Sequence, residues 1–144
     1  MEQKHGGFVI HNGHSHKKQK GQYSSPNRHE IDEILIFYEK VEYIRSSIKR
    51  GKNYVDYILK YPYNCACNKK GLECNLSKRI QINKLIDMLP NYFVQVNQSE
   101  IINVFHLVGQ SGKYLFTEKN KFKITDTYKK QVTSKLLFYF HSSR

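Results

Sequence analysis

Three consecutive polar residues, Asn97-Gln98-Ser99, offer the clearest chemistry in this sequence because they separate two apolar segments. Residues 93–96 before them alternate in the manner of a strand, so the triplet is expected at a turn between two fixed elements. Their side chains both donate and accept hydrogen bonds, and Asn and Gln match the two-point pattern of adenine in the major groove. Asn and Ser also dominate ordinary β-turns, so a polar turn without a ligand is the alternative.

Charge is the strongest global signal. The chain holds 24 Lys and Arg against 12 Asp and Glu, a formal net charge of +12. Residues 1–28 contain five of these basic residues and one acidic residue, which leaves +8 for the remainder. A field of that sign attracts phosphate polymers or anionic membranes, and we expect a folded domain to carry it. A general bias toward Lys, Asn, Ile and Tyr would also make the chain basic.

Length and composition limit the class of protein. A chain of 144 residues has room for one ordinary domain. No apolar run approaches the roughly 18 to 20 residues that span a bilayer, so we expect a soluble cytoplasmic protein with no membrane partner. Residues 1–28 have few apolar positions and are predicted to form a disordered, basic and His-rich arm, followed by one domain over 29–144.

The pattern of apolar residues predicts a mainly β fold with short helices. We expect a strand buried on both faces at 34–38, and strands at 41–48 and 54–59 joined by a turn at 50–53. After a loop over 60–77, helical spacing indicates a short helix at 84–89 with Asn83 as its N-cap. Strands at 93–96 and 104–107 and two hairpins, with strands at 114–117 and 122–124, should follow.

The last segment changes period. Tyr128, Val132, Leu136 and Tyr139 recur at spacings of four, four and three residues, which predicts a terminal amphipathic helix. Thr125 precedes it as a candidate N-cap, whose hydroxyl can accept a hydrogen bond from a free helix N–H group.

The cysteines form the pattern C-x-C-x6-C, at Cys65, Cys67 and Cys74. With a histidine they could make a zinc site, but no fourth ligand lies at zinc-finger spacing, so unligated thiols in a reducing compartment are the preferred interpretation. The sequence has no Gly-rich phosphate loop, zinc-protease helix or nucleophile elbow. We therefore expect no metal, no cofactor and no enzymatic activity.

Three blocks resemble the LytTR family of bacterial DNA-binding domains. They are IDEILIFYEKVEYIR, LIDMLPNYFVQVNQSEIINVFHLV and KFKITDTYKKQV, and the resemblance covers about residues 30–137. The middle block is the most specific, with its Leu-Pro helix stop, its polar triplet and the Ile-Ile-Asn after it. The resemblance implies an elongated β-rich α+β arrangement of small antiparallel sheets with a C-terminal helix. It further implies a bacterial transcriptional regulator whose loops enter the major groove of double-stranded DNA.

Carried over residue by residue, the resemblance implies three reading loops. The first falls near Tyr43 and Arg45, the second on Asn97, Gln98 and Ser99, and the third on Thr125, Asp126 and Thr127. Since Asp126 stands where the family commonly has a basic residue, we expect Lys129 and Lys130, one turn on, to hold the DNA backbone instead. Asn103 is expected to brace the backbone. Because family members commonly bind paired direct repeats, the resemblance implies a monomer in solution or two copies on one DNA site, without a stable dimer in solution.

The sequence departs from the family pattern at two of these loops. The family commonly has His or Arg where Asn97 and Gln98 stand, and a basic residue where Asp126 stands. We interpret Asp126 as a helix cap, since a carboxylate is favourable at a helix N-terminus and repulsive toward phosphate. Two alternatives stay open: a protein-interaction module that kept the fold without reading bases, and an RNA-binding domain whose eleven Tyr stack on bases.

Overall fold

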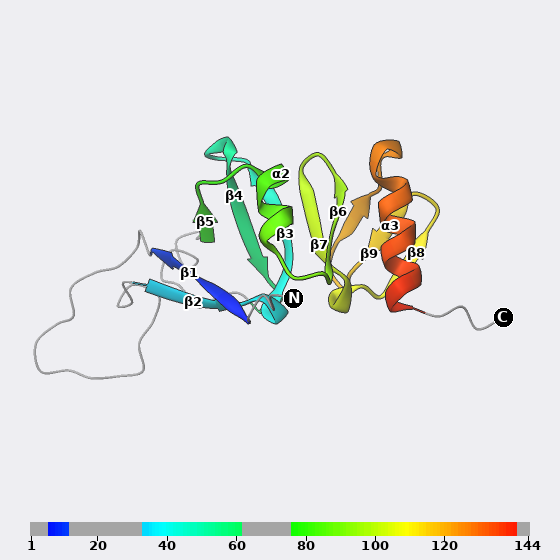
Figure 1. The fold of residues 1–144 in the computed structure, drawn as a ribbon, viewed down its shortest axis with the longest axis horizontal. Coiled ribbons are helices and arrows are strands. Elements are labelled where there is room, and N and C mark those ends of the chain that lie inside the picture. Colours follow the sequence, from blue (N-terminus) through cyan, green and yellow to red (C-terminus); the bar gives the residue numbers. More distant parts are fainter. Residues whose placement is uncertain (1–5, 12–32, 62–75, 141–144) are drawn as a thin grey trace, which may run out of the picture.

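Short antiparallel strands make up most of the structure, a computed structural model that describes residues 6–11, 33–61 and 76–140 (Figure 1). The strands are β1 (Gly7–His11), β2 (Glu33–Phe37), β3 (Val41–Ser47), β4 (Gly51–Leu59), β5 (Leu76–Lys78), β6 (Phe93–Asn97), β7 (Glu100–Asn103), β8 (Gly109–Ser111), β9 (Tyr114–Phe116) and β10 (Lys121–Lys123). The helices are α2 (Ile82–Leu85), α3 (Asp126–Tyr139) and short 3-10 helices at Tyr38–Lys40, Ile86–Met88 and Val104–His106.

A five-stranded sheet in the order β5-β4-β3-β7-β6 forms the centre, with a two-stranded sheet β1-β2 and a three-stranded sheet β10-β9-β8 beside it. These elements follow one another along the long axis of the molecule (Figure 1). The mainly β fold class with small antiparallel sheets and a C-terminal helix is therefore confirmed. None of the helices in the described ranges is long and apolar enough to cross a membrane.

Two hydrophobic cores lie on the two faces of the central sheet. Strand β3 shows why both faces are covered: Ile44 points into the first core and its neighbour Tyr43 into the second. The first core receives β1, β2 and α2, and the second receives β9, β10 and α3. In α3, Val132 is buried in the second core, and the other three residues of the predicted stripe pack against that core. The terminal helix and its apolar stripe are confirmed, and α3 additionally exposes Leu137 and Phe138 outside that stripe.

The sequence-based prediction was wrong at the first two strands. Residues 7–11 of the predicted arm form β1, which pairs with β2 from Gly7 opposite Phe37 to His11 opposite Glu33. Residues 1–5 and 12–28 of that arm lie outside the described residues. Strand β2 is not buried on both faces, since Leu35 and Phe37 are exposed. An uninterrupted run of apolar residues does not reveal whether one or both faces of the strand are covered by other elements.

Three further boundaries differ. The strand expected at 104–107 lies earlier, as β7 (Glu100–Asn103), and Val104–His106 is a 3-10 helix. Helix α2 begins at Ile82, after Gln81 instead of Asn83. The predicted loop ends at β5, and its three cysteines lie outside the described residues. Thr125 is the N-cap of α3, but its hydroxyl makes no capping hydrogen bond.

Candidate nucleic-acid interface

One edge of the central sheet brings together three connections that lie far apart in the sequence. They are the β3–β4 turn at residues 48–50, the β6–β7 turn at 98–99 and the segment 124–125 that enters α3. Backbone hydrogen bonds join neighbouring members: Ser46 N donates to Ser99 O at 2.9 Å, and Thr125 N donates to Val96 O at 3.1 Å. The two hairpin turns and the start of α3 all lie along the upper edge in Figure 1.

Asn97 organises the β6–β7 turn from inside. Its Nδ2 donates to Glu100 Oε1 at 2.8 Å and to the Lys123 carbonyl at 2.9 Å, and its Oδ1 accepts from Ser99 N at 2.8 Å. Both amide hydrogens and the amide oxygen are therefore engaged within the protein. Asn97 ties the turn to itself and to the end of β10.

Gln98 and Ser99 form the tip of this turn. Both residues are exposed, and within the described ranges their side chains have no hydrogen-bond partner. A free amide and a free hydroxyl are thus held on a turn whose backbone is fixed on both sides. Of the predicted triplet, these two side chains are available to a ligand, and that of Asn97 is occupied.

The start of α3 lies next to this turn. Asp126 and Thr127 are exposed and Thr125 is partly buried. Asp126 is the first residue of the helix, where its negative charge interacts favourably with the helix dipole. Gln95 holds the helix in place, because its Nε2 lies 3.3 Å from the Tyr128 hydroxyl and its carbonyl accepts from Gln131 Nε2 at 3.0 Å.

The first predicted loop position is wrong, because Tyr43 and Arg45 lie within β3. The Tyr43 ring is only 8% exposed and packs edge-on against Phe122 with centroids 4.8 Å apart. Burial raises the pKa of its hydroxyl. Arg45 Nε lies 3.5 Å from Oδ2 of the buried Asp56. Neither side chain is placed on the turn of this hairpin.

The turn itself comes at residues 48–50, and the residues that sequence reasoning missed are its cations. Lys49, Arg50 and Lys52 are exposed. The sequence signal for this turn was its glycine, since Arg50-Gly51 had already indicated a turn. In the structure Gly51 adopts a positive φ of 85°, a conformation that favours glycine.

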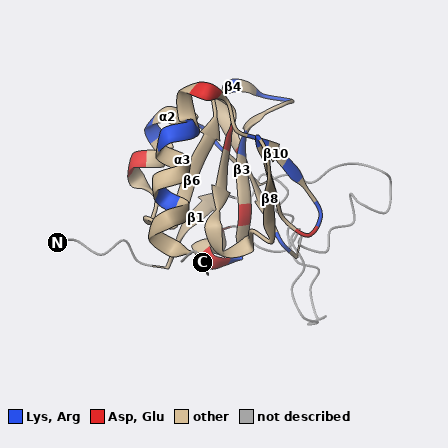
Figure 2. Ribbon diagram, turned by 90° about the vertical axis from the view of Figure 1, so that its right-hand side faces the viewer, with Lys and Arg blue, Asp and Glu red and all other residues tan. Residues whose placement is uncertain are grey.

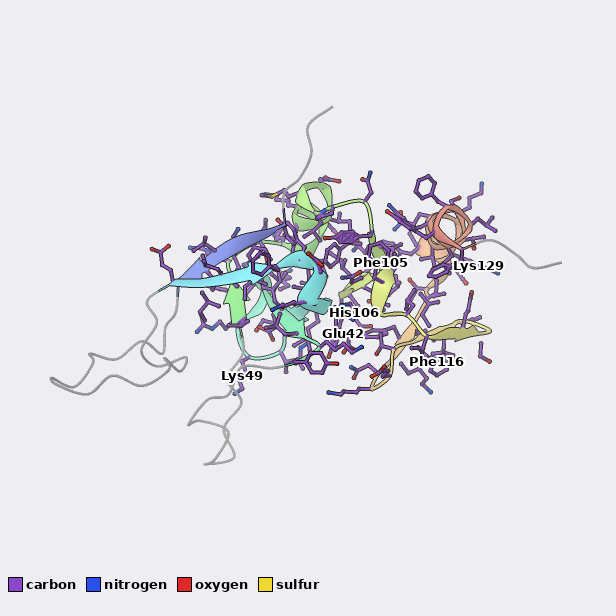
Figure 3. The ribbon with its side chains drawn as sticks, turned by 90° about the horizontal axis from the view of Figure 1, so that it is seen from below. Glu42, Lys49, Phe105, His106, Phe116 and Lys129 are labelled. Atoms are coloured by element: carbon purple, nitrogen blue, oxygen red, sulfur yellow. The ribbon has the colours of Figure 1, made fainter. Side chains whose placement is uncertain are left out.

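Basic side chains flank the β6–β7 turn on both sides. Lys49 lies on one side and Lys129 on the other, well apart along the long axis (Figure 3). Figure 2, which views the molecule along its long axis, shows Lys and Arg positions in blue on β10 and α3. The exposed cations of this edge include Lys49, Arg50, Lys52, Lys123, Lys129 and Lys130. Two acidic residues lie at the same edge: Asp126 at the helix start and Glu100, which accepts a hydrogen bond from Asn97.

We call this surface the basic edge, consisting of the six cations above with Gln98, Ser99 and Thr127. Such an arrangement can neutralise phosphates at two places while it presents hydrogen-bonding groups between them. The described part of the chain contains no cluster of three His, Cys, Asp or Glu that could hold a metal ion. The weak zinc candidate at Cys65, Cys67 and Cys74 lies outside that part.

Comparison with known proteins agrees with the geometry. No protein-family model and no curated protein matches this sequence. Among solved structures, it is similar to the LytTr DNA-binding domain of a protein described as a methyl-accepting/DNA response regulator from Bacillus cereus. The TM-score is 0.57 at 13% sequence identity, with 92% of this chain and 97% of that chain covered. This chain has the LytTR fold. The resemblance inferred from the three sequence blocks is confirmed at the level of the fold.

Within the LytTR fold, Asn103 has the bracing role that the resemblance implied. It is fully buried, and its Nδ2 donates to the Val41 carbonyl at 3.1 Å and the Tyr38 carbonyl at 3.3 Å. Its Oδ1 accepts from Phe105 N at 3.0 Å. Asn103 therefore ties the end of β7 to the start of β3.

Proposed function

We propose that this chain binds double-stranded DNA sequence-specifically through the basic edge and acts as a bacterial transcriptional regulator. The observation that carries the proposal is the pair Gln98 and Ser99, free and exposed on a braced turn with cations on both sides. The name of the similar Bacillus cereus domain, a DNA-binding domain, supports the same function.

The two kinds of side chain have different roles in this proposal. Lysines and arginines contact phosphates, which sets the position of the protein without reading sequence. The Gln98 amide donates to and accepts from an adenine edge, and the hydroxyls of Ser99 and Thr127 add single hydrogen bonds. Asn97 acts indirectly, by holding the turn. Because the reading groups are neutral, discrimination depends on hydrogen bonds, while affinity depends on the cations around them.

The test begins with selection of bound sequences from a random duplex library, followed by anisotropy titrations at several salt concentrations. Lys49→Ala should weaken binding to all duplexes and reduce the salt slope by about one. Gln98→Ala should keep the slope and lose roughly 1 to 3 kcal/mol of discrimination at one base pair. Lys119→Ala is the matched control. Lys119 is exposed on the β9–β10 turn, which lies at the end of β10 opposite to the basic edge.

The proposal fails if no sequence is selected, or if Lys119→Ala changes the salt slope as much as Lys49→Ala. A partner bound with no salt dependence would instead favour a protein-interaction module. RNA binding is less favoured, because among the tyrosines of the described ranges Tyr61 alone, at 78% exposed, is not partly or fully buried. Competition by single strands separates that case.

A further inference from the structure

The β1–β2 sheet presents an apolar outer face. In β2, Ile34 and Ile36 point into the first core, while Leu35 is 65% and Phe37 54% exposed. Val9, directly opposite Leu35 on β1, is 47% exposed. Alternation along the strands therefore places these three large apolar side chains together on one surface. Single exposed apolar residues are common on proteins, but a cluster of them indicates a binding surface.

The free edge of β2 carries backbone groups that no described strand uses. Tyr38 N donates to Gly6 O at 2.7 Å, in register with the β1–β2 ladder. Hydrogen-bonded and non-hydrogen-bonded pairs alternate in an antiparallel ladder. Since Tyr38 bonds to Gly6, the backbone groups of every second residue before it, Ile36 and Ile34, also bond to β1. The N–H and C=O groups of Leu35 therefore point away from β1, and β2 has no other partner among the described strands. Such an edge is a template for another strand.

The charges along β2 are self-complementary. Glu33 begins the strand, and Lys40 follows its end with Nζ 5.8 Å from the centroid of the Phe37 ring. In an antiparallel pair of two β2 strands centred on Leu35, Glu33 of one copy lies opposite Phe37 of the other. The Lys40 ammonium of that second copy is already held at the Phe37 ring. Unlike charges thus meet at both ends, as a two-fold interface requires.

We propose that two copies of this chain associate through the free edge of β2, forming a four-stranded sheet β1-β2-β2-β1. Strand β2 lies at the lower left in Figure 1, away from the basic edge along the top, so association leaves that edge accessible. The contact is one short strand pair with a few side chains, at the small end of specific interfaces, below about 1,200 Å². The dimer is therefore weak and depends on concentration, unlike the monomer in solution expected from the sequence.

Sedimentation equilibrium of the full chain over a wide concentration range measures this association. Leu35→Lys should leave the protein monomeric at concentrations where the parent dimerises. Leu137→Lys is the matched control, because Leu137 on α3 is also 65% exposed, and it should dimerise like the parent. Circular dichroism of both variants verifies that they are folded.

A charge exchange tests the geometry without touching apolar residues. Glu33→Lys and Lys40→Glu should each raise the dissociation constant about two- to thirtyfold, since two symmetric surface pairs are lost. The double variant restores the pair with reversed polarity and should return to within about twofold of the parent. Failure of this rescue would overturn the antiparallel arrangement.

Two other results would overturn the proposal. One is a parent protein that stays monomeric throughout the range, and the other is an equal loss of association in Leu137→Lys. Slow hydrogen exchange at the Leu35 amide in a monomer would show that another segment of the same chain covers the edge, which also excludes the dimer. Loss of DNA binding with association intact would contradict the proposed function alone, so the two proposals fail separately.

Discussion

Replacement of Asn97 and of Gln98 by alanine should have different consequences, although the two residues are adjacent and both are amides. Asn97 makes three hydrogen bonds within the protein, to Glu100, Lys123 and Ser99. Gln98 is exposed, with no side-chain partner among the described residues. Stability should therefore depend on the first residue, and base discrimination on the second.

The magnitudes follow from the number of bonds and their exposure. A hydrogen bond contributes about 0.5 to 1.5 kcal/mol net, and bonds at a partly exposed turn belong at the lower end. Asn97→Ala should thus lower the free energy of unfolding by about 2 kcal/mol, whereas Gln98→Ala should change it by less than about 0.5 kcal/mol. Asn97→Asp keeps the acceptor for Ser99 N but places an oxygen where Nδ2 faced Glu100 Oε1. Charge repulsion there adds about 1 kcal/mol of destabilisation.

Urea unfolding followed by circular dichroism measures stability, because the chain contains no Trp. Anisotropy with the selected duplex measures binding. The expected order of stability is parent, then Gln98→Ala close to it, then Asn97→Ala, then Asn97→Asp. Equal destabilisation by the two alanine variants, or an Asn97→Asp variant as stable as Asn97→Ala, would refute the bracing role. An unchanged base preference in Gln98→Ala would refute the reading role.

Two other perturbations test the fold around β1 and β2. A Cβ at Gly7 would lie 1.9 Å from the Ile36 carbonyl oxygen, so Gly7→Ala should cost about 1 to 3 kcal/mol in urea unfolding; Gly6→Ala, whose Cβ would meet only a Phe37 side-chain atom at 3.6 Å, should cost less than about 0.5. Burial raises the pKa of Tyr57, while an unfolded tyrosine ionises near pH ~10, so stability should fall as pH rises above about 10. Melting temperatures from pH 9 to 11.5 should show a smaller decline in Tyr57→Phe, and an identical decline would exclude this cause.

Local patterns predicted the elements that carry their own signal. The apolar stripe of α3 and the turn residues before β9 and before β10 specify these elements within a few positions, although strand β8 was not predicted. Strand β1 could not be predicted in this way, because it is stabilised by pairing with β2. The sequence on either side of β1 is polar, as in chains that bury too little apolar surface to fold.

The candidate site could be predicted where the family resemblance and the turn residues agreed. It could not be predicted where the strand register determines which residues a side chain faces. The triplet lies at the turn that both indicated. Arg45 seemed an available cation in the sequence, yet the β3–β4 register places it directly opposite Asp56. A cation paired with a buried carboxylate is less available to bind phosphate. The sequence around Arg45 does not reveal that Asp56 is its partner.

Register also explains why the reading groups are confined to the turns. A row of polar residues crosses all five strands of the central sheet as successive cross-strand neighbours: Ser77, Asp56, Arg45, Glu100 and Asn97. Ser77 Oγ donates to Asp56 Oδ1 at 2.7 Å, and Arg45 Nε faces Oδ2 of the same carboxylate. At the other end Asn97 donates to Glu100. Ser77, Asp56 and Arg45 thus contact one another at one end of the row, and Glu100 and Asn97 at the other. These side chains are engaged within the sheet, whereas Gln98 and Ser99 at the turn remain free to bind.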